Sequence, residues 1–266
     1  MTEATYNNIE FSVTDGLAVL TLNRPDRLNS FDTEMHGEVK QVFRTIKQDS
    51  SIRCLLITGN GRGFCAGQDL SDRAVTVGDE APDLSVSIEN NYNPMIRNIT
   101  GLALPVICAV NGVAAGAGAN IALACDLVMA AKSASFIQSF NKLGLVPDSG
   151  GAWILPKLVG HAMAMRLCLL GEKVPAQEAL EMGLICQVCD DDALKDEALA
   201  LGRQLAIAPT KGLGLIKRAL QASQSNTFNQ QLDLERDLQG IAGRSDDYRE
   251  GVAAFMAKRT PNYKGC

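Results

Sequence analysis

In the first half of the chain, segments with the apolar pattern of a strand alternate with segments with the apolar spacing of a helix. The stretch "GLAVLTLNRP" has the alternation of a strand and ends at Asn-Arg-Pro. In the following segment, 31–50, apolar side chains recur at helical spacing, at Met35, Val39, Val42, Phe43 and Ile46. Two later runs, "IRCLLITGNGRG" and "PVICAVNG", predict nearly continuous apolar strands that break at glycine and asparagine. Buried strands that alternate with helices predict an α/β fold.

Residues 112–131, "GVAAGAGANIALACDLVMAA", are apolar enough to suggest a membrane span. They include Asn120 and Asp126, however, and a charge within a span is costly. We therefore expect a buried helix that opens near Gly116 and runs into a buried strand, and we expect no membrane partner.

Beyond Pro175 the pattern becomes helical. We predict an α/β core over 1–190 and a helical C-terminal region over 191–266. Amphipathic helices beyond a complete core often bury their apolar stripes against another subunit. The least periodic segment, 73–93, is rich in Gly, Pro, Asp and Glu and is predicted to be a mobile binding loop.

Composition narrows the classes of partner. The net charge of −5 and the pI of about 5.2 argue against general nucleic-acid binding, which needs a basic face. A small anionic molecule needs only a local group of Arg and Lys. Most of the eight cysteines stand in apolar runs, and the one C-x-x-C, Cys186 and Cys189, has no further ligands nearby. With no secretory pattern at the start, we expect a reduced, cytoplasmic setting.

Two glycine-rich turns follow predicted strands, "GNGRGFCAGQDL" at 59–70 and "NGVAAGAGAN" at 111–120. Neither has the spacing of a dinucleotide-binding loop or of a P-loop. Glycine at such turns permits close backbone packing. It also lets N–H groups at a helix start point into a cavity, where two of them could hold one oxyanion.

Acid–base chemistry has few candidates. The two histidines, His36 and His161, occupy positions that predict structural roles, and no Ser-His-Asp set or metal spacing is found. Asp148, in "GLVPDSGG", lies between a proline and two glycines with apolar residues on both sides. It could cap the following helix, or it could be a catalytic carboxylate.

An ordered set of motifs over essentially the whole chain resembles the enoyl-CoA hydratase/isomerase (crotonase) superfamily. The resemblance rests on "TLNRPDRLNSF", "GRGFCAGQDL", "PVICAVNGVAAGAGANIALACDLVMAA", "KLGLVPDSGG" and "REGVAAFMAKRTP". It implies a spiral of ββα units, a helical trimerisation region giving a homotrimer or hexamer, and an acyl-CoA thioester as substrate. It places the oxyanion donors at the backbone N–H groups of Gln68 and Ala117. It implies no cofactor beyond the CoA of the substrate and no metal.

The resemblance also implies contacts to the substrate. They fall on the turn residues Ala66, Gly67, Asp69 and Leu70. CoA would lie near Arg27 and near Lys258, the latter from the same or a neighbouring subunit, with Arg24 and Arg259 close to these positions.

The expected reaction is inferred from the positions at which this chain departs from the hydratase pattern. The two hydratase glutamates correspond to Asn120 and Phe140, which would line the pocket, and the remaining acid is Asp148. The resemblance is strongest to isomerases that convert ring-1,2-epoxyphenylacetyl-CoA to oxepin-CoA in phenylacetate degradation, with a 3-enoyl to 2-enoyl shift as a second activity. The alternatives are a hydrolytic arylacyl-CoA enzyme with Asp148 as nucleophile, and a non-catalytic acyl-CoA-binding subunit.

Overall fold

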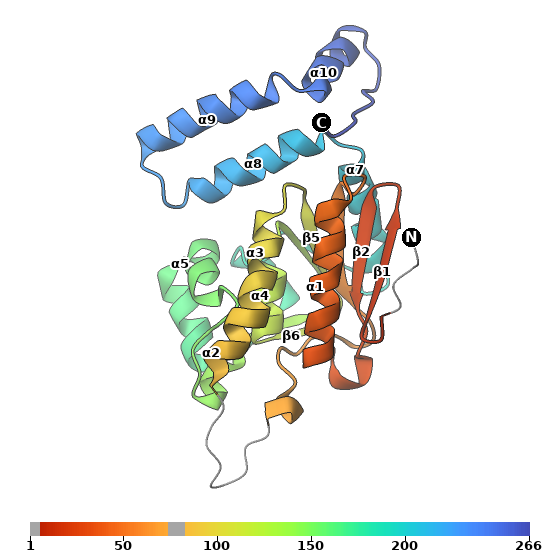
Figure 1. Cartoon of the computed structure of the whole chain (residues 1–266). Coiled ribbons are helices and arrows are strands. Elements are labelled where there is room, and N and C mark those ends of the chain that lie inside the picture. The colour runs from red at the N-terminus through yellow and green to blue at the C-terminus, as the bar shows by residue number, and fades with distance from the viewer. Residues whose placement is uncertain (1–5, 74–82) are drawn as a thin grey trace.

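Two β-sheets form the frame of the protein (Figure 1). The computed structural model describes residues 6–73 and 83–266. One sheet has the order β1-β2-β3-β5-β7-β10, parallel except for the β1–β2 hairpin, and the other has the order β4-β6-β8-β9, parallel except for β8–β9. The strands are β1 (Ile9–Thr14), β2 (Leu17–Leu22), β3 (Cys54–Gly59), β4 (Gly63–Cys65), β5 (Val106–Val110), β6 (Val113–Ala115), β7 (Leu127–Ala131), β8 (Ser135–Ile137), β9 (Lys173–Pro175) and β10 (Gln187–Cys189).

From β3 to β8, consecutive strands alternate between the two sheets. In each of the pairs β3–β4, β5–β6 and β7–β8, the first strand joins the six-stranded sheet and the second joins the four-stranded sheet. Each return of the chain adds one parallel strand to both sheets, so the chain winds as a spiral. The prediction of an α/β spiral of ββα units is confirmed.

Helices cover the sheets and form the C-terminal part. They are η1 (Pro25–Arg27), α1 (Thr33–Gln48), η2 (Leu70–Arg73), α2 (Leu84–Ser87), η3 (Ile88–Tyr92), α3 (Asn93–Gly101), α4 (Ala117–Leu123), η4 (Ser139–Leu143), α5 (Gly151–Leu170), α6 (Ala176–Glu181), α7 (Leu194–Ala206), α8 (Thr210–Ala222), α9 (Phe228–Ala242) and α10 (Asp246–Met256). Helix α1 begins at the cap Asp32, whose side chain accepts from Met35 N, and it buries the five apolar side chains predicted for it.

The segment predicted to be an irregular binding loop is helical in its second half. Residues 74–82 lie outside the described residues. From Leu84 onward the chain forms α2, η3 and α3, and Asp83 caps the start by accepting from Ser85 N. The helical signal was present in the spacing of Tyr92, Met95 and Ile99, all buried, but polar neighbours obscured it.

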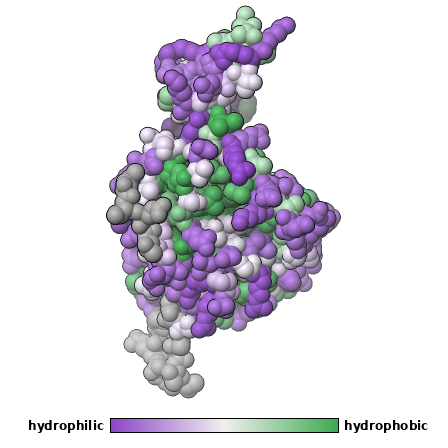
Figure 2. Space-filling view, turned by 90° about the vertical axis from the view of Figure 1, so that its right-hand side faces the viewer, coloured by the Kyte–Doolittle hydropathy of each residue, from purple (hydrophilic) through white to green (hydrophobic). Residues whose placement is uncertain are grey.

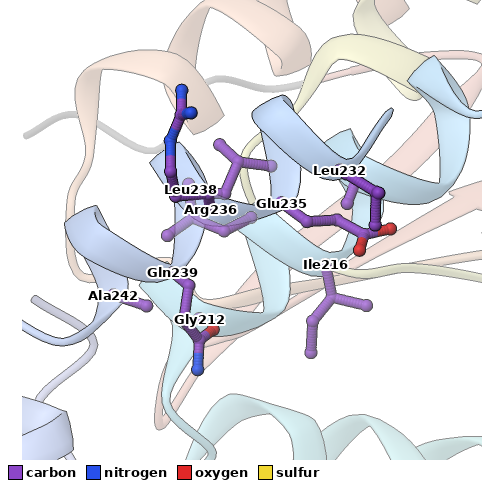
Figure 3. A pocket seen from close by; sticks show the side chains of 10 residues that line it. Gly212, Ile216, Leu232, Glu235, Arg236, Leu238, Gln239 and Ala242 are labelled. Carbon is purple, nitrogen blue, oxygen red and sulfur yellow. The ribbon is translucent and has the colours of Figure 1, made fainter. Parts of the chain in front are cut away.

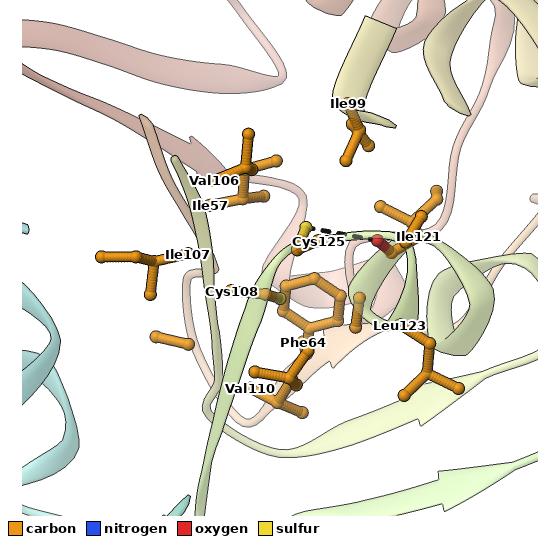
Figure 4. Close-up of a cluster of buried hydrophobic side chains, with 14 of the residues drawn as sticks. Ile57, Phe64, Ile99, Val106, Ile107, Cys108, Val110, Ile121, Leu123 and Cys125 are labelled. Atoms are coloured by element: carbon orange, nitrogen blue, oxygen red, sulfur yellow. Dashed lines mark hydrogen bonds between the residues drawn. The ribbon is translucent and has the colours of Figure 1, made fainter. Parts of the chain in front are cut away.

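The core lies between the sheets and their covering helices (Figure 4). All five residues of β5 are buried, and β3 buries its first four. Figure 4 shows Phe64 beside Cys108 and Val110, with Ile121 and Cys125 on the adjoining segment. Cys125 donates to the Ile121 carbonyl oxygen, and the cysteines at 54, 65, 108 and 125 are buried free thiols. These four behave as small core residues, as their apolar surroundings predicted.

Within the described residues, α5 is the one helix that is long and apolar enough to cross a membrane by length and composition. It contains Pro156, and the backbone at Gly160 (φ 75°, ψ 161°) is not helical. The break divides α5 into two shorter helices, so its 20 residues do not make one continuous span. The segment 112–131 instead forms β6, α4 and β7, as a buried stretch of a globular core.

The change from strands to helices comes after Cys189, close to the boundary predicted at residue 190. Helix α7 nevertheless packs on β2, β3, β5 and β7, where a Cβ on Gly202 would lie 2.8 Å from Leu17. Helices α8 and α9 pack against each other and project from the core with α10, and we call these three helices the C-terminal arm (Figure 1). Figure 2 shows apolar side chains gathered on the core just below this projecting part.

A partly buried ion pair attaches the arm to the core. Lys217 Nζ on α8 donates to Asp126 Oδ2 (2.8 Å) and to the Ile99 carbonyl oxygen (2.9 Å). The same carboxylate oxygen accepts from Val106 N, at 2.8 Å. Burial raises the pKa of Asp126, and Lys217 opposes that rise by stabilising the charged form.

We predict that Lys217→Ala destabilises the protein by about 1–3 kcal/mol. Removing the partner of a partly buried charge typically costs about 1–3 kcal/mol, and here Val106 N still bonds the carboxylate and limits the loss. Urea unfolding followed by circular dichroism measures the loss. The matched control is Arg166→Ala, whose partner Glu172 lies 3.0 Å away on the exposed surface, and less than about 1 kcal/mol is expected there. Equal effects of the two variants would contradict the assignment of Asp126 and Lys217 as the anchor.

Candidate active site

The two glycine-rich turns meet in space. Strands β4 and β6 are parallel neighbours, and the turns leave their carboxyl ends. A Cβ on Gly67 would lie 3.0 Å from Ala115 O and 3.3 Å from Ala117 N, and a Cβ on Gly118 would lie 2.3 Å from Cys65 O. Real Cβ atoms essentially never come within 3.0 Å of backbone, so only glycine fits at position 118, and a side chain at position 67 would be tightly packed. The two turns therefore leave neighbouring strands of the smaller sheet.

The predicted donor at Gln68 belongs to a peptide whose orientation is defined. Phe31 N donates to Gly67 O at 2.7 Å. The C=O and N–H of a trans peptide point in opposite directions, so the N–H of Gln68 points away from Phe31. Gly67 has a φ of +90°, which is strained for residues with a side chain.

The second predicted donor, Ala117, is the first residue of α4. The N–H groups of a first helical turn have no acceptor within their own helix, and the helix dipole favours negative charge there. Gly116 makes the entry with φ 53° and ψ −127°. Since Gly67 packs against Ala117 N, the two predicted donor positions lie on touching turns.

Asp148 lies half-buried on the segment between η4 and α5. Its backbone oxygen accepts from Asn120 Nδ2 (2.8 Å) and Gly151 N (2.9 Å), and its carboxylate Oδ1 accepts from the Ser149 hydroxyl (2.9 Å). Asn120 is on α4, which begins at Ala117. The segment that carries the acid is therefore tied to the helix that carries a predicted oxyanion donor.

The alternative role of Asp148 as a helix cap is wrong. The cap position of α5 is Gly150, in left-handed conformation, and no side chain caps that end. The Asp148 carboxylate is instead bonded by its neighbour Ser149. A half-buried acid that does not cap its helix remains a candidate for chemistry.

The residues at the two hydratase-acid positions lie below the surface. Asn120 has no exposed surface, and its Oδ1 accepts from Gln138 Nε2 at 2.9 Å. A Cβ on Gly151 would meet the Asn120 amide at 2.2 Å, so the two pack tightly. Phe140 is also buried, with its ring 3.9 Å from where a Cβ on Gly116 would lie. Asn120 therefore supports the Asp148 segment from beneath, whereas sequence analysis placed it in the pocket lining.

The residues of the first turn that were predicted to contact the substrate differ in their exposure and in their bonds within the chain. Ala66 N donates to Leu28 O, and Leu70 is exposed. The Asp69 carboxylate is buried and engaged within the chain, by the amide and hydroxyl of Ser71 and by Arg24 at 3.0 Å. Hydrogen bonds from Ser71, with Arg24, hold the pKa of Asp69 below its usual range. The Asp69 side chain thus stabilises the turn.

The predicted CoA-binding cations are not together in one chain. Arg27 is exposed on η1, near the first turn, and Lys258 is exposed just after α10. Figure 1 places α10 at the end of the molecule remote from that turn. Arg24 and Arg259 are engaged in ion pairs, Arg24 with Asp32 and Asp69, and Arg259 with Glu250.

Two hollows in the surface were compared with the position of the glycine-rich turns. A cavity of about 300 Å³ borders Gln68, and it is lined by Thr33, His36, Gln68, Asp83, Val86, Ser87, Asn90 and Asn91. A groove of about 600 Å³ lies between α8 and α9 and is lined by these two helices alone (Figure 3). The larger hollow is remote from both glycine turns, so volume does not locate the chemistry, and we place the site at the turns.

Several contributing residues were missed by sequence analysis. Tyr92, Gln138 and Ser149 all bond a predicted site residue. The partners of Tyr92 and Gln138 are distant in sequence, and the contact of Ser149 with its neighbour Asp148 has no local pattern that marks it. The Cys65 thiol lies beside Gly67 N at 3.4 Å, and burial raises its pKa to about 12, so it is a neutral thiol at neutral pH and not a nucleophile.

Paired glycine turns, a supported carboxylate and a two-sheet spiral are the features of an acyl-CoA enzyme of the crotonase fold. The chain belongs to the enoyl-CoA hydratase/isomerase family, whose model matches residues 12–266. It is 57% identical over 253 residues to the 1,2-epoxyphenylacetyl-CoA isomerase of Escherichia coli, covering 95% of this chain and 97% of that protein. It is 34% identical over 247 residues to the 2,3-dehydroadipyl-CoA hydratase of the same organism, covering 93% and 94%. The crystal structure of an enoyl-CoA hydratase from Bacillus anthracis superposes with a TM-score of 0.92 at 30% identity, covering 98% of this chain and 100% of that one.

We predict that Gly67→Ala lowers kcat on an acyl-CoA substrate by at least about 10²-fold, the loss typical of removing one oxyanion donor. The added Cβ would meet Ala115 O and Ala117 N and is incompatible with the φ of +90°. Gly37→Ala is the matched control, because nothing lies within 4 Å of its Cβ position on α1. It should keep wild-type kcat and gain about 0.5–1 kcal/mol in stability. Wild-type turnover by Gly67→Ala would remove the turn contact from the mechanism.

Proposed function

We propose that the protein is an acyl-CoA isomerase that converts ring-1,2-epoxyphenylacetyl-CoA to oxepin-CoA, a step of phenylacetate degradation. The observation that carries the proposal is the attachment of Asp148, through Asn120, to the helix that begins at Ala117. The likeness to the Escherichia coli isomerase, at 57% identity over nearly the whole of both chains, supports this substrate.

The proposed mechanism uses one acid and two backbone donors. The thioester carbonyl oxygen accepts from Gln68 N–H and Ala117 N–H, which stabilise the negative charge that develops on it. The Cα–H beside the carbonyl becomes acidic, and the Asp148 carboxylate takes the proton. The electron pair opens the epoxide system, and a return proton completes the rearrangement, so substrate and product have the same atoms. CoA enters as part of the substrate, and these steps use no separate cofactor.

Isomerisation fits this site better than hydration. Addition of water normally needs a second group to orient it, and the two hydratase-acid positions hold Asn120 and Phe140. The Asn120 amide is already bonded at both ends, by Asp148 O and by Gln138 Nε2. The same acid and donors would shift a 3-enoyl-CoA to a 2-enoyl-CoA.

We also propose that the protein works as a homotrimer or hexamer in which Lys258 completes the CoA site of a neighbouring subunit. The separation of α10 from Arg27 within one chain supports a contribution from another chain (Figure 1). The arm also exposes large apolar side chains, at Ile216, Leu220, Phe228, Leu232, Phe255 and Met256. Apolar surface of this extent marks interaction sites.

We predict that Asp148→Asn lowers kcat by about 10²–10⁴-fold, because the amide cannot accept the proton. Asparagine keeps the shape of the side chain and an oxygen for the Ser149 hydroxyl, so Tm should stay close to wild type. Both are measured on one preparation, with the epoxide and a 3-enoyl-CoA as substrates. A normal kcat would leave the proposed reaction without its base, and the isomerase proposal would be withdrawn. A covalent Asp148 adduct in rapid-quench mass spectra would instead indicate the hydrolytic alternative.

We predict that Lys258→Ala raises KM for CoA thioesters more than it lowers kcat, as the loss of uniform binding requires. Mixed oligomers test whether the lysine acts in a neighbouring site. Subunits with Lys258→Ala, combined with Asp148→Asn subunits, should recover turnover at a wild-type KM, since intact acids would then meet intact lysines. If KM in the mixture stays as high as in Lys258→Ala alone, the lysine serves its own chain. An unchanged KM in Lys258→Ala would remove it from the site.

A further inference from the structure

The Gln68 side chain is bonded at both ends of its amide. Its Nε2 donates to the Phe31 carbonyl oxygen at 2.9 Å, and its Oε1 accepts from the Tyr92 hydroxyl at 3.0 Å. Gln68 is the residue whose backbone N–H is the proposed oxyanion donor. The side chain therefore ties this peptide to two residues that lie far from it in sequence.

The direction of the Gln68 N–H depends on the position of Phe31. Phe31 N donates to Gly67 O at 2.7 Å, and Asp69 N donates to Phe31 O at 2.9 Å, forming an isolated parallel bridge. The peptide joining residues 67 and 68 is thus oriented by one hydrogen bond from Phe31. Any displacement of Phe31 would turn the Gln68 N–H within the site.

Phe31 is held by a buried aromatic cluster. The rings of Phe31, His36 and Tyr92 have centroid separations of 4.8 Å (Phe31–His36), 4.6 Å (His36–Tyr92) and 6.2 Å (Phe31–Tyr92). Phe31 and Tyr92 are each 1% exposed. Of the three, Tyr92 adds a polar contact that reaches the oxyanion turn directly, through Gln68 Oε1.

The ion pairs on either side of the peptide between Gly67 and Gln68 do not fix the orientation of that peptide. Arg24 bridges Asp32 (2.9 Å), which follows Phe31, and Asp69 (3.0 Å), which follows Gln68. They hold the two segments side by side but make no bond to the peptide between Gly67 and Gln68. Its fine orientation rests on the Phe31 amide and on the Gln68 side chain.

We propose that Tyr92 is a positioning residue for the oxyanion hole, acting through the Gln68 side chain on the Gln68 N–H. The proposal rests on the proposed function. A donor stabilises an oxyanion only when it is already aimed at the place where charge develops, about 2.7–3.1 Å away. Without the Tyr92 hydroxyl, Gln68 Oε1 loses its hydrogen-bond donor in a partly buried place, and the side-chain amide reorients. The peptide then has a wider range of orientations, and the transition state loses more than the ground state.

The first test is Tyr92→Phe, which keeps the ring in the cluster. We expect kcat to fall about tenfold, a part of the 10²–10³-fold lost when a donor is removed altogether, with KM within about twofold. Tyr6→Phe makes the same chemical change elsewhere on the core and should keep wild-type kcat. If Tyr92 serves only packing, Tyr92→Phe will lower Tm without lowering kcat at temperatures where the protein is folded, which overturns the proposal.

Carbonyl polarisation tests the proposal separately from turnover. Infrared difference spectra of bound phenylacetyl-CoA, labelled with ¹³C at the thioester carbonyl, report the donors through a downward shift of the C=O stretch. Wild type and Asp148→Asn should show the full shift, and Tyr92→Phe a smaller one. A full shift in Tyr92→Phe would overturn the positioning role. If the wild-type protein polarises the carbonyl but isomerises neither substrate, the proposed function is contradicted and this inference is not.

A double-mutant cycle tests the path through Gln68. Gln68→Leu keeps the backbone N–H but loses both side-chain bonds, so it should lower kcat at least as much as Tyr92→Phe. Because both changes break the same hydrogen bond, the double variant should lose little more than Gln68→Leu alone. Independent, multiplying losses would show that Tyr92 does not act through Gln68.

Discussion

The contact between the two glycine turns is the constraint on which the site depends. Gly118 packs against Cys65 O at a distance that no side chain would allow, and Gly67 packs tightly against Ala117 N. The contact follows from the spiral, because β4 and β6 are neighbours in the smaller sheet and deliver their following turns to the same edge. The two proposed oxyanion donors are backbone N–H groups and need no side-chain functional group, so in the proposed mechanism the reaction depends on the acid beside them.

In this chain one acid, Asp148, lies near the two glycine-rich turns, and the two hydratase-acid positions hold Asn120 and Phe140. The position of a hydratase glutamate holds Asn120, which is fully buried and bonds the backbone of the Asp148 segment. A buried amide with both ends bonded is stable, whereas a buried carboxylate at the same place would need a charged partner. Asn120 therefore supplies no acid for hydration and supports the segment that carries Asp148, the proposed isomerisation acid.

The C-terminal arm is fixed to the core at one end and exposes apolar side chains along its length. It is attached to the core by the Lys217–Asp126 pair and by the close approach of Gly214 to Ala103 O. Its outer apolar side chains are exposed within one chain, and so is the remote Lys258. An arm that is anchored at its base and apolar along its length suits a subunit contact that brings its tip to another active site.

The sequence by itself determined the fold class, the helix and strand types of the long periodic segments, and the two turns, because periodicity and glycine spacing are local signals. It also singled out Asp148, through its family pattern. Only the tertiary structure decided that Asp148 does not cap α5, that Asn120 lies beneath the site, and that the Asp69 carboxylate is engaged by Arg24. It likewise revealed the link from Tyr92 to Gln68 and the helices after Leu84. Such contacts join residues far apart in sequence, and their partners are often backbone atoms that any residue supplies, so a single sequence carries no local trace of them.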